Sequence, residues 1–175
     1  MAAVTGLLTA VFWPGSMDPD TLDELHEAAS GRYSDWHTPL LSALWRGPYL
    51  LGLRSPGFVL FGSLMCLQVG LYLILRVRFG RVWSVALSSA CLLFPPITGF
   101  AVHNGRDAWF AALLVAAFGL LTRAARTEGR ARGWALALSI VASLLVAAAR
   151  QNAYPTLAVL YAAAAALMIP ARVRR

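Results

Sequence analysis

Side chains that could carry proton chemistry are concentrated in one stretch of this sequence, WPGSMDPDTLDELHEAASGRYSDWHTPL, residues 13–40. The stretch holds six of the chain's eight acidic residues and two of its three histidines. A positioned carboxylate can take a proton from a hydroxyl group, and an arginine can stabilise the charge of a departing phosphate. The stretch therefore offers candidate general bases, and the elements around it must supply the positive charge.

A short helix is predicted at the first of these acids. Asp18-Pro19 is typical of a helix start, with Asp as the N-cap and Pro at the first position, and Gly31 is a typical stop. Asp18 would then be either a cap or a catalytic group. Asp20 would either complement the helix dipole or act as the base.

The remaining acids of this helix are interpreted as a solvated face. Asp20, Asp23, Glu24 and Glu27 follow i, i+3, i+4, i+7 spacing and therefore share one side. Exposed helix charges of this kind contribute little. We expect a neighbouring apolar face to lie on the membrane surface or on a helical bundle; its residues are Leu22, Leu25 and Ala29.

A second short helix is expected from Thr38 as cap and Pro39 as first position to Gly47. Its apolar stripe is Leu40, Leu41, Leu44 and Trp45. Between the two helices, Tyr33-Ser34-Asp35-Trp36-His37 brings a carboxylate and an imidazole beside aromatic residues. Asp35 and His37 are candidate binding residues, and the alternative is an aromatic anchor at the membrane interface.

Two later polar segments complete the candidate site. The first is His103-Asn104-Gly105-Arg106-Asp107, in which Asn-Gly indicates a turn and Asp107 could cap the next helix or pair with Arg106. The second is Arg150-Gln151-Asn152, where the alternative for Arg150 is a snorkelling side chain. From these segments we take Arg106, Asp107, Arg150 and Asn152 as candidate groups for binding a phosphate or a substrate.

The rest of the chain predicts an all-α polytopic membrane protein. Hydrophobic residues make up 59% and charged residues only 13%, whereas a soluble domain is about one quarter charged. We expect residues 1–13 to be a partial first span, residues 14–54 to be an outer loop with one or two surface helices, and residues 55–175 to be a helical bundle. Five to six spans are predicted in all, and Pro95-Pro96 should kink one of them. The five complete spans are about 55–75, 82–102, 108–122, 134–149 and 155–170.

Arginines fix the predicted orientation of the bundle. All 15 basic residues are arginine, and ten of them lie in loops on one side with Glu128 as the only acid there. The positive-inside rule makes that side cytoplasmic and places the acidic loop outside. The same placement in short loops argues against nucleic-acid binding. No ionisable residue lies in the middle of a span, which disfavours an ion-coupled transporter. Cys66 and Cys91 are expected to be buried and reduced.

At the acidic loop the sequence resembles bacterial membrane glycosyltransferases of the GT-C type. The resemblance rests on Pro14-Gly15-Ser16-Met17-x-x-Asp20 and on Tyr33-Ser34-Asp35-Trp36-His37-x-Pro39. It is nearest to a DUF6020-like branch and is more distantly similar to the protein O-mannosyltransferase and aminoarabinose-transferase group. It extends over about residues 11–153. These enzymes usually have many more spans, so we expect the chain to be a fragment or a truncated member.

The resemblance implies an activity and roles for particular residues. It implies transfer of a sugar from a polyprenyl-phosphate-linked donor to an acceptor outside the membrane, with Asp20 as general base. It places His37 near the donor or a metal, and Asp107 with Arg106 at the acidic position of the second loop. Mg²⁺ or Mn²⁺ is compatible with such ligands, although no fixed spacing requires it. The alternative is a non-catalytic membrane subunit or scaffold; the expected partners are the lipid-linked sugar and membrane lipids.

Overall fold

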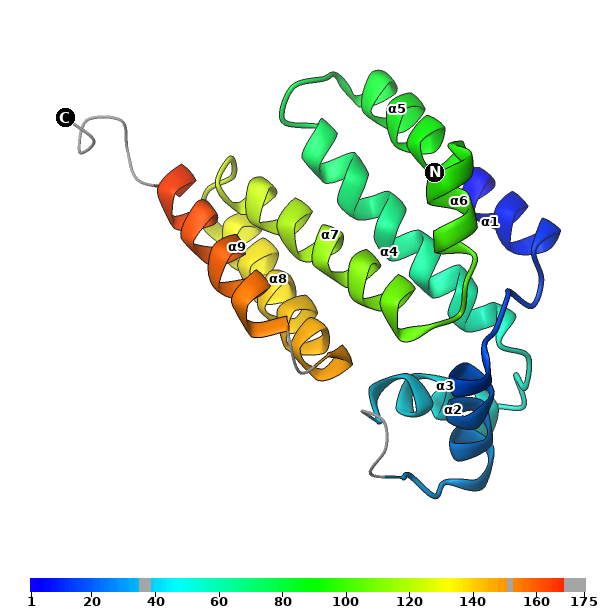
Figure 1. The fold of residues 1–175 in the computed structure, drawn as a ribbon. Coiled ribbons are helices and arrows are strands. Elements are labelled where there is room, and N and C mark those ends of the chain that lie inside the picture. Colours follow the sequence, from blue (N-terminus) through cyan, green and yellow to red (C-terminus); the bar gives the residue numbers. More distant parts are fainter. Residues whose placement is uncertain (35–38, 151–152, 169–175) are drawn as a thin grey trace.

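The computed structural model describes residues 1–34, 39–150 and 153–168, and in that part of the chain it is built of helices without strands. The predicted all-α class is confirmed. In Figure 1 the longer helices form a bundle, and two short helices lie together at one end of it. In chain order the helices are α1 Ala2–Val11, α2 Pro19–Ser30, α3 Leu40–Leu50, α4 Gly57–Leu75, α5 Arg81–Leu93, α6 Pro95–Ala101, α7 Arg106–Ala124, α8 Gly129–Ala149 and α9 Ala153–Met168.

Three helices are long and apolar enough to cross a membrane, namely α4, α7 and α8. The pair α5 and α6 counts as a fourth when it is taken as one span, and it is bent by 74° where Pro95 and Pro96 begin α6. The predicted kink is confirmed, because a proline ring cannot continue the preceding helical turn. The described part thus has three or four candidate spans. The number five to six is not confirmed, since α1 and α9 are shorter apolar helices.

The helix α7 is central to the bundle and packs against both α4 and α8. Its contact with α4 includes two glycines at which the backbones come close together. A Cβ atom on Gly70 would lie 2.6 Å from the backbone of Val115 and Ala116, and one on Gly119 would lie 2.6 Å from the carbonyl oxygen of Gly70. Small residues of this kind let two helix backbones approach closely.

The predicted helix at Asp18 is confirmed at both ends. Asp18 caps α2 by accepting a hydrogen bond from the backbone N–H of Thr21 at 2.7 Å, and Pro19 is its first residue. Gly31 follows Ser30 with a φ of 73°, the left-handed conformation that glycine adopts without strain. Local sequence signals therefore determine where α2 begins and ends.

The next helix, α3, is longer than predicted. It begins at Leu40 and continues through Gly47 to Leu50, with Pro48 in its last turn. The expected stop at Gly47 is therefore wrong, and the cap predicted at Thr38 lies outside the described residues. Leu41 and Trp45 of the expected apolar stripe are buried, and they pack with Ala28 of α2 against the bundle. This contact fixes the α2–α3 pair on the end of the bundle.

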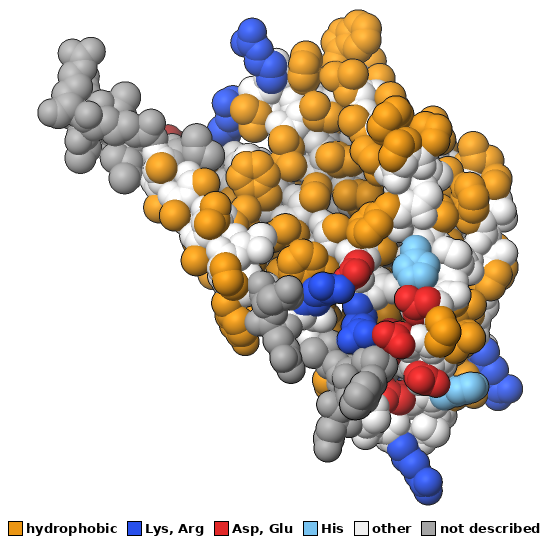
Figure 2. Space-filling model, viewed as in Figure 1, with side chains coloured by type: hydrophobic (Ala, Val, Ile, Leu, Met, Phe, Trp, Pro, Cys, Tyr) orange, Lys and Arg blue, Asp and Glu red, His pale blue; other side chains and the backbone are white. Residues whose placement is uncertain are grey.

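The buried face of α2 differs from the predicted one. Leu22 and Ala29, expected on the apolar face, are exposed, whereas Thr21 and Glu24 are buried. The polar side of the helix therefore faces the protein. Figure 2 shows the consequence: acidic and basic side chains gather over this end of the molecule, while the body of the bundle is mainly hydrophobic.

Candidate functional site

A polar pocket lies where α2 meets the starts and ends of the long helices. Its volume is about 130 Å³. Of the eight residues selected from the sequence, five line it, and they come from three separate parts of the chain. Asp35, His37 and Asn152 lie outside the described residues. The lining consists of Asp18, Asp20, Thr21, His103, Gly105, Arg106, Asp107 and Arg150.

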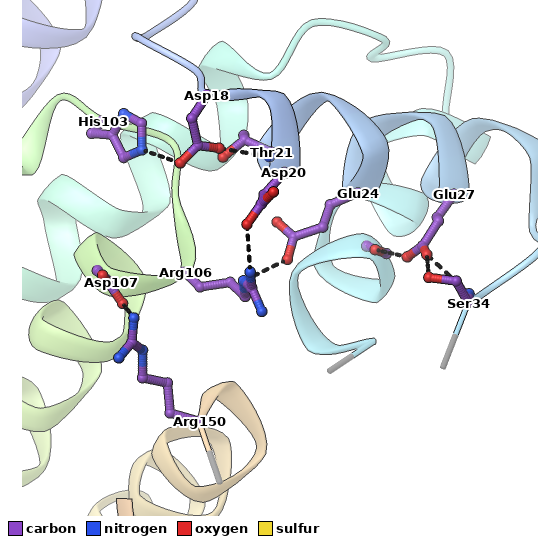
Figure 3. Close-up of polar contacts among 11 residues, drawn as sticks. Asp18, Asp20, Thr21, Glu24, Glu27, Ser34, His103, Arg106, Asp107 and Arg150 are labelled. Carbon is purple, nitrogen blue, oxygen red and sulfur yellow. Dashed lines mark hydrogen bonds and ion pairs between the residues drawn. The ribbon is translucent and has the colours of Figure 1, made fainter. Parts of the chain in front are cut away.

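His103 connects Asp18 to a serine. Its Nε2 lies 3.3 Å from a carboxylate oxygen of Asp18, and its Nδ1 lies 3.2 Å from the Ser16 hydroxyl (Figure 3 shows the contact with Asp18). Hydrogen bonding to Thr21 lowers the pKa of the Asp18 carboxyl, burial partly offsets this, and His103 lowers it further. A carboxylate with a lowered pKa is a weaker base. Asp18 is therefore better suited to capping α2 and orienting His103 than to taking a proton.

The backbone beside His103 is attached to the segment before α2. Ser16 N–H donates to the Val102 carbonyl at 3.1 Å, and Asn104 N–H donates to the Ser16 carbonyl at 2.8 Å. The Asn104 side chain is fully buried and donates to the Pro14 carbonyl at 2.7 Å. The turn predicted at Asn104-Gly105 is thus held against residues 14–16, almost 90 positions earlier in the chain.

Arg106 lies between two carboxylates of α2. Its guanidinium is 3.2 Å from Asp20 and 3.1 Å from Glu24, as Figure 3 shows. Asp20 is more than half exposed, whereas the side chain of Glu24 is 1% exposed. The predicted alternative of an Arg106–Asp107 pair is not what the structure shows. Arg106 instead joins α7 to α2 across the pocket.

Glu24 was expected on a solvated face, and that expectation is wrong. Both of its carboxylate oxygens are buried without a hydrogen bond to any described residue; Arg106 compensates the charge only as an ion pair. Burial raises the pKa of Glu24 to about 7, and Arg106 opposes part of that rise. The nearby charges of Asp18, Glu27 and Asp20 raise it further. Glu24 can therefore change its protonation state near neutral pH.

Glu27 was assigned to the same solvated face, and that assignment is wrong as well. Its carboxylate accepts hydrogen bonds from the backbone N–H and hydroxyl of Ser34, at 2.9 and 2.5 Å, and from the hydroxyl of Ser42 at 2.7 Å. These contacts join the end of α2 to α3. Glu27 is consequently a buried structural acid that helps to hold the two short helices together.

Asp107 and Arg150 form an ion pair between the start of α7 and the end of α8 (Figure 3). Both side chains are about half exposed, at 53% and 42%. The pair is therefore more accessible to a ligand than the Arg106–Glu24 pair. Among the candidate residues, Arg150 is the cation that an incoming anion can reach with the least rearrangement.

His103 and Glu24 are the site residues that the sequence interpretation missed. His103 lies in the segment selected at 103–107, three residues before Arg106, and that position was the available signal. Glu24 carried no such signal, because its partner is 82 positions away in the chain. Among the described residues there is no group of three or more His, Cys, Asp or Glu side chains that could hold a metal ion. The expectation of Mg²⁺ or Mn²⁺ stays a prediction, and Asp35 and His37 lie outside the described residues.

The fold and pocket define a helical protein compatible with a membrane location, with a charged pocket at one end of its bundle. Comparison with protein-family models, with curated proteins and with solved structures finds no match. The functional assignment therefore depends on the residues of the pocket and on the motif resemblance at residues 14–39.

Proposed function

We propose that this chain is a GT-C-type membrane glycosyltransferase, or the N-terminal part of one, which uses a polyprenyl-phosphate-linked sugar donor. The observation that carries the proposal is the pocket itself. It collects carboxylates, an imidazole and two arginines at one end of an apolar bundle, where a lipid-linked phosphate and a water-borne acceptor would meet. The motif resemblance around Asp20 supports the same activity.

The proposal includes the finer membrane arrangement. In it α1 and α9 also enter the membrane, which gives six spans when α5 and α6 count as one. Their apolar composition and the exposure of Leu7, Val11 and Val159 support this. The pocket faces outward in this arrangement, because the arginine-rich segments after α4 and after α7 lie at the opposite end of the bundle.

Asp20 is the proposed general base. It is the more exposed of the two catalytic candidates, and it lines the pocket. In the reaction its carboxylate takes the proton of an acceptor hydroxyl as that oxygen bonds to the anomeric carbon of the sugar. The bond from that carbon to the phosphate oxygen breaks, and the phosphate leaves with the electron pair. Arg150 stabilises the resulting charge, and Asp107 must release Arg150 for this to occur.

The first test is binding of a polyprenyl phosphate to the purified full chain, with and without Mn²⁺. We expect saturable binding by the wild type and by Asp20→Asn, and at least about tenfold weaker binding by Arg150→Ala, since a charge-assisted contact to phosphate is lost. Arg54→Ala is the matched control, because Arg54 is an exposed arginine of the segment joining α3 to α4 and does not line the pocket. In a transfer assay with a lipid-linked sugar, Asp20→Asn should be inactive. Equal loss of binding in both arginine variants would refute the assigned phosphate site.

A second candidate function is a non-catalytic membrane subunit. The observation that favours it is that each charged residue lining the pocket already has a partner within the chain: His103 for Asp18, Arg106 for Asp20 and Arg150 for Asp107. In this function the ion pairs of the pocket have a structural role: they hold α2 on the bundle and join the start of α7 to the end of α8. Absence of any saturable polyprenyl-phosphate binding by the wild type would favour this function over the transferase.

A further inference from the structure

A second hollow lies at the opposite end of the bundle from the charged pocket. It is open to the surface and has a volume of about 310 Å³. It lies between the carboxyl ends of α4 and α7, which Figure 1 shows side by side and far from α2 and α3. Its lining consists of Tyr72, Leu73, Arg76, Val77, Thr122, Arg123, Arg126 and Thr127.

A close contact between α4 and α7 lies next to this hollow along the two helices. Gly70 and Gly119 bring the backbones of α4 and α7 together, and neither helix could carry a side chain there without displacing the other. The hollow begins within one turn of these glycines, where the two helices carry Tyr72 and Arg123 in place of glycine. The hollow therefore lies next to the close glycine contact, and longer side chains line it.

The charged residues that line the hollow are all positive. Three arginines line it and no carboxylate does. Within the described part of the chain, Arg76, Arg123 and Arg126 form no ion pair, and the contact of Arg76 is a hydrogen bond donated to the Phe79 carbonyl at 3.1 Å. This differs from the first pocket, where each charged lining residue has an internal partner.

The hydrogen-bond donors that line the hollow differ in whether they already have a partner. The hydroxyls of Thr122 and Thr127 already donate to backbone carbonyls of α7, at 2.7 and 3.0 Å. The Tyr72 hydroxyl makes no hydrogen bond to another described residue. Guanidinium groups and one phenol are thus the free donors, a set suited to the oxygens of a phosphate. Leu73 and Val77 add an apolar wall beside them.

We propose that this hollow binds the phosphodiester headgroup of an anionic membrane lipid. Basic pockets between the ends of membrane helices bind such headgroups. The helix α4, which forms one side of the hollow, is apolar and long enough to span a membrane, so an acyl chain can lie beside it. The site is separate from the charged pocket, and it does not depend on the proposed transferase activity.

The test compares two double variants of the full chain in detergent micelles. Arg123→Gln/Arg126→Gln removes two charges from the hollow. Arg78→Gln/Arg130→Gln removes two charges from exposed positions at the same end that do not line it. Phosphatidylglycerol is titrated into each protein, with phosphatidylcholine as the neutral lipid, and bound lipid is counted by native mass spectrometry.

We expect the wild type to bind phosphatidylglycerol in preference to phosphatidylcholine. The hollow variant should bind it at least about tenfold more weakly, and the exposed variant should bind like the wild type. Tyr72→Phe removes a single hydroxyl group from the hollow and should weaken binding about two- to tenfold. This variant provides the test if the double variant fails to fold. Equal weakening by the two double variants would overturn the proposal, because net charge alone would then explain the binding. Inorganic phosphate that competes at concentrations similar to those of the lipid would overturn the assignment to a lipid headgroup.

Discussion

Replacing Glu24 with glutamine isolates the effect of one buried carboxyl on stability. In the folded protein the pKa of Glu24 is about 7, whereas its ordinary value is 4.5, and the cause is burial. A difference of one pH unit between folded and unfolded pKa corresponds to about 1.4 kcal/mol. The ionised form of Glu24 therefore costs on the order of 3 kcal/mol of folding free energy above neutral pH.

The direction of the pH dependence follows from the sign of the shift. Because the folded pKa lies above the unfolded one, the favourable contribution of the protonated group is complete below pH 4.5. It is lost as the pH rises through about 7. Glutamine at this position has no proton to lose. The wild type should consequently lose about 3 kcal/mol relative to Glu24→Gln between acidic and mildly alkaline pH.

The assay is chemical unfolding of both proteins in the same micelles, at a series of pH values across that window. Histidines ordinarily titrate in this range as well, but they are present in both proteins, so their effect cancels in the difference. Asp23→Asn is the matched control: Asp23 is exposed on the same helix, and its loss should leave the wild-type pH dependence in place. Parallel pH curves for the wild type and Glu24→Gln would refute the reasoning.

Two further predictions concern the contacts that hold the bundle and its end together. Glu27→Gln should lower the free energy of unfolding by about 1–3 kcal/mol, because the NH₂ group of the amide cannot accept the hydrogen bonds that a carboxylate oxygen accepts. A loss of stability no larger than that of Asp23→Asn would contradict this prediction. Gly70→Ala should destabilise by at least about 1–3 kcal/mol by forcing α4 away from α7, as measured by thermal unfolding. Gly133→Ala is the control, because Gly133 lies in α8 with open space around it, and this change should be neutral or stabilising by up to about 1 kcal/mol. A similar loss of stability in both alanine variants would count against the close contact between α4 and α7.

Features set by neighbouring residues could be predicted from the sequence. The cap at Asp18, the stop at Gly31 and the break at Pro95-Pro96 all depend on backbone chemistry within one helical turn. The convergence of Asp20, Arg106 and Arg150 could be anticipated as well, because residues at alternate span ends meet at one side of a membrane. The predicted number of five to six spans is not confirmed, since apolar runs such as residues 1–13 do not reveal how much of them becomes a long helix.

The buried acids could not be predicted, and the reason is physical. Helical periodicity shows which residues share a face, but it cannot show which face the rest of the fold covers. In α2 the polar face is the one that docks, because Arg106 of α7 carries the positive charge that pairs with Asp20 and Glu24. Hydrophobicity alone predicted that the face with Leu22 would dock, but the Leu22 side chain is 45% exposed. Charge complementarity between segments more than 80 positions apart decided the orientation.

This docking also couples the titration of Glu24 to the candidate base. Arg106 is shared by Glu24 and Asp20, and the two carboxylates compete for one guanidinium. When Glu24 is ionised, Arg106 divides its charge between them. When Glu24 takes a proton, Asp20 is the carboxylate left to Arg106 among the described residues of α2. The protonation of Glu24 therefore decides how Arg106 divides its charge between the two carboxylates. This links the titration of a buried acid to the charge environment of one that lines the pocket.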